Sequence, residues 1–162
     1  MDDFPVPQQI RSVVVTAFSE AQRRGSVTVE PEHLLLALAS EDDSLAAGIL
    51  AGVGLDYESL DRALDTERGR SLAVVGIHEL DESLLNATPR PTRPGWASAT
   101  REAFRRAQPL GRGRRRRAEL DVLYGVITAN VGTVARALEY AGVDRDGLIG
   151  RVERERLADR DE

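Results

Sequence analysis

The sequence of 162 residues has no cysteine, no lysine, few aromatic residues and no long apolar run. Without cysteine, disulfides, thiolate metal sites and thiol nucleophiles are excluded. Because aromatic residues make up only 4% of the chain, we expect a core of Leu, Val, Ile and Ala, which favours packed helices. No segment approaches the roughly 18 apolar residues of a membrane span, and the polar start of the chain does not resemble a signal peptide. A cytoplasmic protein with one sizeable core is therefore expected.

Charge is distributed unequally along the chain. Residues 1–89 hold 6 Arg against 16 Asp and Glu, whereas residues 90–162 hold 16 Arg against 11 acidic residues. The densest basic segment contains five arginines: Arg112, Arg114, Arg115, Arg116 and Arg117. Such a run could neutralise phosphates. It has no interleaved aromatic residues for base stacking, so a solvated loop or a contact with an anionic, acidic partner is favoured over nucleic-acid binding.

Two stretches are alike at a nearly fixed offset, which indicates an internal repeat. Residues 17–22 (AFSEAQ) return as residues 103–108 (AFRRAQ), and residues 47–56 (AGILAGVGLD) return as residues 135–144 (ARALEYAGVD). The offset changes from 86 to 88 residues between these pairs. An insertion between the first and second helices of the later copy explains the change.

Each copy is predicted to form four helices, from its apolar spacing and its capping and breaking residues. Pro31 suits the first turn of the second helix, Asp43 or Ser44 can cap the third, and Asp56 can cap the fourth. In the first copy the helices are expected near residues 8–24, 31–39, 44–50 and 56–67. In the second copy they are expected near residues 95–108, 119–128, 132–141 and 144–157.

A segment of different composition separates the two copies. Residues 89–94 (PRPTRP) cannot be helical and predict an extended connector. Residues 71–85 are apolar enough to pack as one more helix or turn, and a short piece of sheet near residues 73–77 is the only sheet expected. The predicted organisation is a first repeat over residues 1–68, a connecting segment over 69–94 and a second repeat over 95–162, packed as one pseudo-symmetric domain.

Residues 32–38 (EHLLLAL), followed by a short helix and by residues 53–56 (VGLD) with their Gly-Leu pair, resemble the Clp-N repeat. Two such repeats precede the AAA+ modules of Hsp100 ATPases such as ClpA and ClpC. The resemblance covers residues 8–68 and 95–157. It implies an all-α fold of two four-helix repeats related by an approximate twofold axis. The segment 72–77 (LAVVGI) also resembles actinobacterial stand-alone relatives, and no GxxxxGK[ST] phosphate loop is present, so we expect a stand-alone protein without the ATPase.

The resemblance implies a binding function without catalysis. Clp N-domains dock adaptors and capture substrates, in some lineages by recognising phosphorylated arginine, and in actinobacteria they bind cyclic peptide antibiotics. We therefore expect an accessory or decoy protein of the Clp protease system that captures peptides, adaptors or such antibiotics, and that needs no cofactor. One alternative is a nucleic-acid or regulatory binding protein that acts through the segment 112–117. Another is a structural subunit in direct contact with the Clp ATPase.

By position in the family, the ligand groove lies between the first helices of the two copies. Its expected lining is Phe4, Val6, Ile10, Val14, Thr92, Trp96 and Arg101. For Trp96, anchoring in the core and contact with a ligand are equally open alternatives. In the family's phosphoarginine pockets a Glu of each Glu-His pair contacts the guanidinium. Glu32 is such a residue, but Leu120 stands at the equivalent position of the second copy, which puts a second pocket in doubt.

Neither histidine predicts a catalytic or metal site. A structural role is favoured for His33, near the start of a helix. His78 precedes three acidic residues, but the H-E-x-x-H zinc motif requires a second histidine where residue 82 is Glu. No G-x-S-x-G nucleophile motif occurs either. We therefore expect neither an enzyme nor a metal protein.

Overall fold

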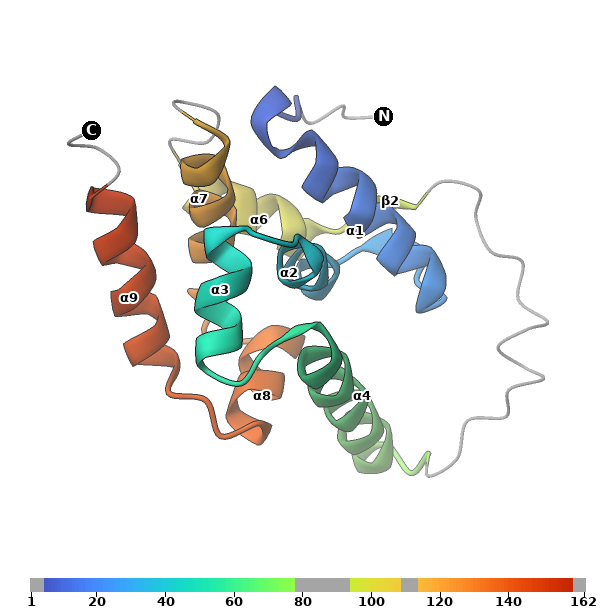
Figure 1. The fold of residues 1–162 in the computed structure, drawn as a ribbon. Coiled ribbons are helices and arrows are strands. Elements are labelled where there is room, and N and C mark those ends of the chain that lie inside the picture. The colour runs from blue at the N-terminus through green and yellow to red at the C-terminus, as the bar shows by residue number, and fades with distance from the viewer. Residues whose placement is uncertain (1–4, 78–93, 109–113, 159–162) are drawn as a thin grey trace.

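The computed structural model describes residues 5–77, 94–108 and 114–158 (Figure 1). The described elements are η1 (Gln8–Ile10), α1 (Arg11–Arg23), β1 (Thr28–Val29), α2 (Pro31–Ser40), α3 (Leu45–Gly52), α4 (Tyr57–Val74), β2 (Gly95–Trp96), α6 (Ser98–Arg106), α7 (Arg115–Ile127), α8 (Thr133–Tyr140) and α9 (Arg145–Ala158). Four α-helices, α1 to α4, belong to the first repeat, and four, α6 to α9, belong to the second. The predicted all-α fold of two four-helix repeats is confirmed.

Local capping explains where the helices of the first repeat begin. Pro31 occupies the first position of α2, where its missing N–H costs no hydrogen bond. The Ser44 hydroxyl accepts a hydrogen bond from the Ala47 amide at 3.0 Å, and the Asp56 carboxylate accepts one from the Ser59 amide at 2.9 Å. Ser44, and not Asp43, is therefore the residue that caps α3.

The fourth helix is longer than expected. α4 continues to Val74 because Gly69, inside it, adopts ordinary helical geometry. The helix ends only where Gly76 has a φ of 85°, and there the Ile77 amide donates to the Leu72 carbonyl at 2.9 Å, as in a Schellman motif. The expectation of a short piece of sheet at residues 73–77 was wrong, because these residues form the end of α4 and its capping turn. The division of the chain at residues 68 and 94 stays a prediction.

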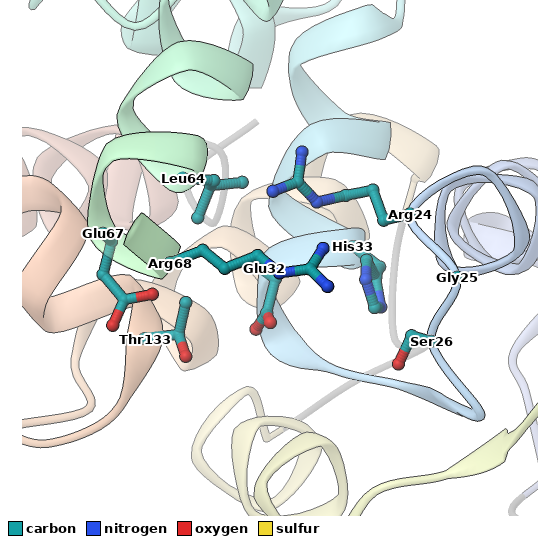
Figure 2. A pocket seen from close by; sticks show the side chains of 9 residues that line it. All are labelled: Arg24, Gly25, Ser26, Glu32, His33, Leu64, Glu67, Arg68 and Thr133. Carbon is teal, nitrogen blue, oxygen red and sulfur yellow. The ribbon is translucent and has the colours of Figure 1, made fainter. Parts of the chain in front are cut away.

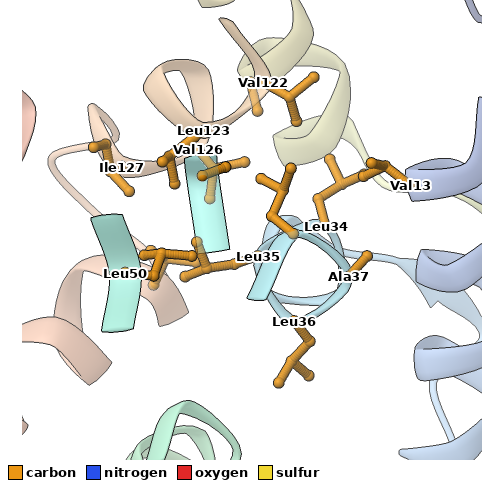
Figure 3. Packing of buried hydrophobic residues seen from close by; sticks show 14 of the residues in the cluster. Val13, Leu34, Leu35, Leu36, Ala37, Leu50, Val122, Leu123, Val126 and Ile127 are labelled. Atoms are coloured by element: carbon orange, nitrogen blue, oxygen red, sulfur yellow. The ribbon is translucent and has the colours of Figure 1, made fainter. Parts of the chain in front are cut away.

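The core is centred on α2, in which every residue from His33 to Leu38 is buried. Leu34, Leu35, Leu36 and Leu38 are fully buried. Figure 3 shows α2 nearly end-on, with Leu35 directed towards Leu50 of α3 and Leu36 directed away from it, and α2 contacts α1, α3, α4 and α7. On the facing side, α7 contributes buried residues of the second repeat to the same cluster: Val122, Leu123, Val126 and Ile127. The two repeats therefore share one hydrophobic core.

Polar contacts also join the repeats. Strands β1 and β2 pair in parallel, with Val29 opposite Trp96. The Thr100 hydroxyl donates to the Val29 carbonyl at 2.6 Å in a buried position. Near the opposite end of the molecule, the Arg136 guanidinium of α8 donates to the Glu67 carboxylate of α4 at 2.8 Å. These contacts fix the surface on which the first and second repeats meet.

Candidate functional site

A cavity of about 270 Å³ opens where the first repeat meets the start of α8 (Figure 2). Its lining comes from the turn after α1, the start of α2, the middle of α4 and the start of α8. The lining residues are Arg24, Gly25, Ser26, Glu32, His33, Leu64, Glu67, Arg68 and Thr133. The cavity thus combines cationic, anionic and hydroxyl groups around a small apolar wall.

Glu32 is the carboxylate at the centre of this cavity, in the first turn of α2. Burial raises its pKa to about 7, against the effect of its own backbone amide, and the nearby negative charges of Glu30 and Glu67 act in the same direction as burial. Arg24 lies close, but its guanidinium pairs with Asp61 at 2.6 Å and also with another carboxylate of α4. Within the described residues, Glu32 has no ion pair. A cationic group that enters the cavity would therefore stabilise the ionised carboxylate.

His33 has a structural role. Its Nδ1 accepts a hydrogen bond from the Glu30 backbone amide at 2.9 Å, which satisfies a donor just before α2. Burial lowers the pKa of His33 to about 4, and the positive charges of Arg24 and Arg23 contribute. The ring is therefore neutral near pH 7 and holds the start of α2 in place, as the sequence favoured.

The second repeat has a buried ion pair where the first has a Glu-His pair. Leu120 is fully buried, and Asp121, the counterpart of His33, is 1% exposed. The Arg156 guanidinium donates to the Asp121 carboxylate at 2.7 Å and lies 4.2 Å from the centre of the Tyr124 ring. Arg68, which is 88 residues before Arg156, lines the cavity of the first repeat instead. The polar cavity is therefore a property of the first repeat.

The expected groove between the first helices is only partly accessible. Phe4 and Thr92 lie outside the described residues. Ile10 is fully buried and Val14 is 5% exposed, so both face the core in this conformation and can only support a groove from beneath. Val6 is half-buried against the core. Position in the family placed Ile10 and Val14 on the groove, but only the structure shows how completely they are covered.

Trp96 lies at the junction of the two repeats. Its ring contacts Phe18 of α1 edge-on, with ring centres 5.2 Å apart, and Phe104 of α6 in the same manner at 5.5 Å. The side chain is half-buried and therefore retains an accessible part. Arg101, one turn into α6, is also half-buried. Trp96 thus anchors β2 in the core, and contact of its accessible part with a ligand stays a prediction.

Two exposed apolar residues of the first repeat were missed by the sequence analysis. Val15 of α1 is 59% exposed, and Val27, directly before β1, is 62% exposed. Val15 follows two buried valines, so the continuous apolar run gave no sign that its last residue faces solvent. Its position outside the i, i+3, i+4 stripe of the helix was the signal that could have identified it as exposed.

The described part of the arginine segment does not form the solvated loop that was one of its two predicted roles. Arg112 lies outside the described residues. Arg114 is the residue before α7, and Arg115, Arg116 and Arg117 form its first turn, so the described part is not a solvated loop. The helix begins earlier than its counterpart α2 because no proline stands at the equivalent of Pro31 and because Arg and Ala favour helix.

Metal-ligating clusters and membrane-spanning helices are both absent from the described ranges. No group of three or more His, Asp or Glu side chains there is placed to hold a metal ion. The acidic segment after His78 lies outside these ranges. Among the helices described, none is long and apolar enough to cross a membrane.

Comparison with known proteins gives a family match and matches to solved structures. The family model of the Clp repeat (R) N-terminal domain matches residues 7–90. The fold is similar to the crystal structure of the N-terminal domain of the caseinolytic protease associated chaperone ClpD from Arabidopsis thaliana, with a TM-score of 0.62 and 20% sequence identity. That match covers 96% of both chains, so it extends over the second repeat as well. At this identity the structural match shows the fold alone.

Proposed function

Because this chain belongs to the Clp repeat N-terminal domain family, whose domains are non-catalytic and bind partners and substrates of the Clp system, we propose that it captures peptide segments of such proteins. The proposed site is the surface between α1 and α6, and cyclic peptides that target Clp N-domains are candidate ligands for it. The chain would act as an accessory or decoy. By binding a ligand of the ATPase's own N-domain, it lowers the free concentration of that ligand by mass action.

The observation that carries the proposal is the position of Trp96. It is the only tryptophan of the chain, it is half-buried, and it is held between Phe18 and Phe104 at the junction of the repeats. Large aromatic side chains fixed in this way are typical binding hot spots, because little side-chain entropy is lost when a ligand covers them. Val15 and Val27 add exposed apolar surface to α1 and to the segment before β1.

Titration of a Clp-targeting cyclic peptide, followed by Trp96 fluorescence and by calorimetry, tests this site. We expect saturable binding at micromolar concentrations. Trp96→Ala should weaken it about thirtyfold, as a central hot spot does. Trp96→Phe, which keeps an aromatic ring between its neighbours, checks that the loss does not come from unfolding. Val131→Ser, at a residue that is 84% exposed on the segment before α8, serves as the control. Absence of saturable binding at tens of micromolar would rule out the groove.

The cavity around Glu32 favours a second binding function, the recognition of a phosphorylated arginine. The guanidinium group of the ligand would meet the Glu32 carboxylate, whose pKa is raised to about 7 by burial. Arg68 and Ser26 line the same cavity. Since the second repeat holds the Asp121–Arg156 ion pair instead, we expect a single site per chain.

Calorimetric titration with phosphoarginine tests this function. The expected stoichiometry is one, the affinity should rise between pH 6 and pH 8 as Glu32 ionises, and Glu32→Gln should abolish this pH dependence. Two equivalent sites, or a Glu32→Gln variant that binds like the wild type, would contradict the assignment.

A further inference from the structure

Strand β2 has one edge that pairs with β1 and a second edge that has no hydrogen-bonding partner. The Gly95 amide donates to the Val27 carbonyl at 3.2 Å. The Ala97 amide donates to the Val29 carbonyl, also at 3.2 Å. Because the backbone groups of successive residues in a strand point to opposite edges, the N–H and C=O of Trp96 point away from β1. Within the described residues the sheet has only these two strands, and the Trp96 backbone makes no hydrogen bond.

The outer edge of β1 is different, because a neighbouring side chain closes it. The Ser26 hydroxyl donates to the Thr28 carbonyl at 2.7 Å and accepts from the Thr28 amide at 3.3 Å. One side chain therefore satisfies both outward-facing backbone groups of Thr28. Trp96 has no such partner in the part of the chain that the structure describes, so β2 offers the edge at which this sheet can be extended.

The surface beside this edge is aromatic on one face of the sheet and open on the other. The half-buried Trp96 ring lies on the face that contacts Phe18 and Phe104. Since side chains alternate between the faces of a strand, Gly95 belongs to the opposite face. Gly95 is exposed, and a Cβ atom placed on it would meet nothing within 4 Å. A strand added beside β2 would therefore meet an apolar ring on one face and free space on the other.

A single residue of an added strand can satisfy both free backbone groups of Trp96. In an antiparallel hydrogen-bonded pair, two opposite residues exchange both of their N–H···O=C bonds. The two residues of β2 are enough for one such pair. The occupant must therefore offer an amide donor and a carbonyl acceptor on the same residue, together with an apolar side chain to cover the indole. An extended polypeptide meets this requirement, whereas a nucleic-acid backbone does not.

We infer that the captured segment is a linear peptide of a partner protein that adds to β2 as an antiparallel strand, an inference that rests on the function proposed above. Its paired residue accepts from the Trp96 amide and donates to the Trp96 carbonyl. The apolar side chain of that residue lies beside the indole, and the two flanking side chains point to the face of Gly95. The added strand continues the ladder by which the two repeats already pair. Recognition then depends on the main chain and on one apolar position.

Two isomers of the peptide Lys-Thr-Ile-Thr-Ile-Thr-Ile-Thr-Lys test this edge, each labelled with fluorescein and measured by fluorescence anisotropy. One isomer carries N-methyl groups on its three Ile residues, and the other carries them on three of its Thr residues. When the Ile side chains lie on the face of Trp96, the Ile N–H groups face β2 and the Thr N–H groups face away. We expect the Ile-methylated isomer to bind about tenfold more weakly or worse, because it cannot donate to the Trp96 carbonyl.

Variants of Trp96 separate the backbone from the indole. Trp96→Ala removes the ring and keeps the backbone, so it should weaken both isomers alike and leave the ratio of their affinities unchanged. Trp96→Phe, which keeps a ring between Phe18 and Phe104, should show the same ratio even if the alanine variant fails to fold. Val131→Ser is the matched control and should change neither affinity.

Three results would overturn the inference. Equal affinities of the two isomers, both reduced by Trp96→Ala, would leave the Trp96 site intact but remove strand addition from it. Binding of the cyclic peptide without binding of either isomer would have the same meaning, whereas failure of all three ligands would overturn the proposed function as well. Dimerisation of the protein that the Thr-methylated isomer reverses, measured by sedimentation, would assign the edge to a second copy of this chain.

Discussion

Two adjacent residues at the start of α2 titrate in opposite directions from their usual ranges. Burial lowers the pKa of His33 to about 4 and raises the pKa of Glu32 to about 7. In both cases the neutral form is favoured, because a charge is costly in this partly enclosed place. Each shift makes stability depend on pH, with opposite signs for the two residues.

For His33, the folded-state pKa lies below the unfolded value of 6.5. Its contribution to stability is therefore complete above pH 6.5 and is lost as the pH falls towards 4. Relative to His33→Gln, the wild type should lose about 3 kcal/mol of unfolding free energy between pH 6.5 and pH 4. The glutamine side chain can still accept a hydrogen bond from the Glu30 backbone amide, so the variant keeps that contact. Urea denaturation at pH 7.5, 5.5 and 4 measures the difference. His78→Gln is the control, and parallel pH profiles for wild type and His33→Gln would refute the prediction.

For Glu32, the folded-state pKa lies above the unfolded value of 4.5. Its favourable contribution is complete below pH 4.5 and is lost as the pH rises through 7, so the ionised residue destabilises the fold at pH 8. We expect Glu32→Gln to be more stable than the wild type at pH 8, by about 1–3 kcal/mol, and the gain to shrink towards pH 5. Thermal unfolding at both pH values tests this. Glu58→Gln, at an exposed position of α4, should show no such gain.

At the scale of elements, α6 and α7 approach each other closely at Gly125. A Cβ atom added to Gly125 would lie 2.1 Å from the Ala103 carbonyl oxygen, which belongs to the backbone of α6. Gly125 also accepts a hydrogen bond from the Arg106 guanidinium at 2.9 Å. The glycine therefore sets the distance between these helices.

Gly125→Ala should push α6 away from α7 and destabilise the protein by about 1–3 kcal/mol. Gly69→Ala in α4 is the matched control, because nothing lies within 4 Å of its added Cβ atom. The control should stabilise the protein by about 0.5–1 kcal/mol, since alanine favours helix over glycine. Chemical denaturation gives both values. Equal effects of the two substitutions would show that the α6–α7 contact can adjust without cost.

The elements differ in how far the sequence could predict them. The starts of α2, α3 and α4 depend on Pro31, Ser44 and Asp56, whose effects are local, and all three were predicted. The start of α7 was predicted four residues too late, because the repeat suggested a start equivalent to that of α2 although the arginines continue the helix. The pairing of β1 with β2 involves two residues on each side and depends on tertiary contacts that no local pattern records.

The same limit applies to the candidate sites. Glu32 was identified from its motif, but its raised pKa comes mainly from burial, to which helices distant in the sequence contribute, and to a smaller extent from the charges of Glu30 and Glu67. The burial of Ile10 and Val14 depends on how α1 packs against the helices around it. Sequence motifs therefore indicated which residues to consider, and only packing decided which of them can touch a ligand.

At the scale of the whole molecule, the repeats are too strongly connected to unfold independently. They share the core between α2 and α7, the β1–β2 pairing and the Arg136–Glu67 ion pair. We expect a single cooperative unfolding transition in urea, as is usual for single domains of this size. Trp96 fluorescence reports on the junction and circular dichroism on all helices, so the two curves should coincide. Separate midpoints would mean that one repeat folds without the other.

The buried contact between Thr100 and the Val29 carbonyl also has a consequence for synthesis on the ribosome. Thr100 lies 71 residues after Val29 in the chain. At roughly 5–20 residues per second, the first repeat emerges several seconds before this partner and before the part of α7 that covers α2. During that interval the leucines of α2 that later face α7 remain exposed to water. A nascent chain of this protein therefore offers a strongly apolar helix to its surroundings until its second half arrives.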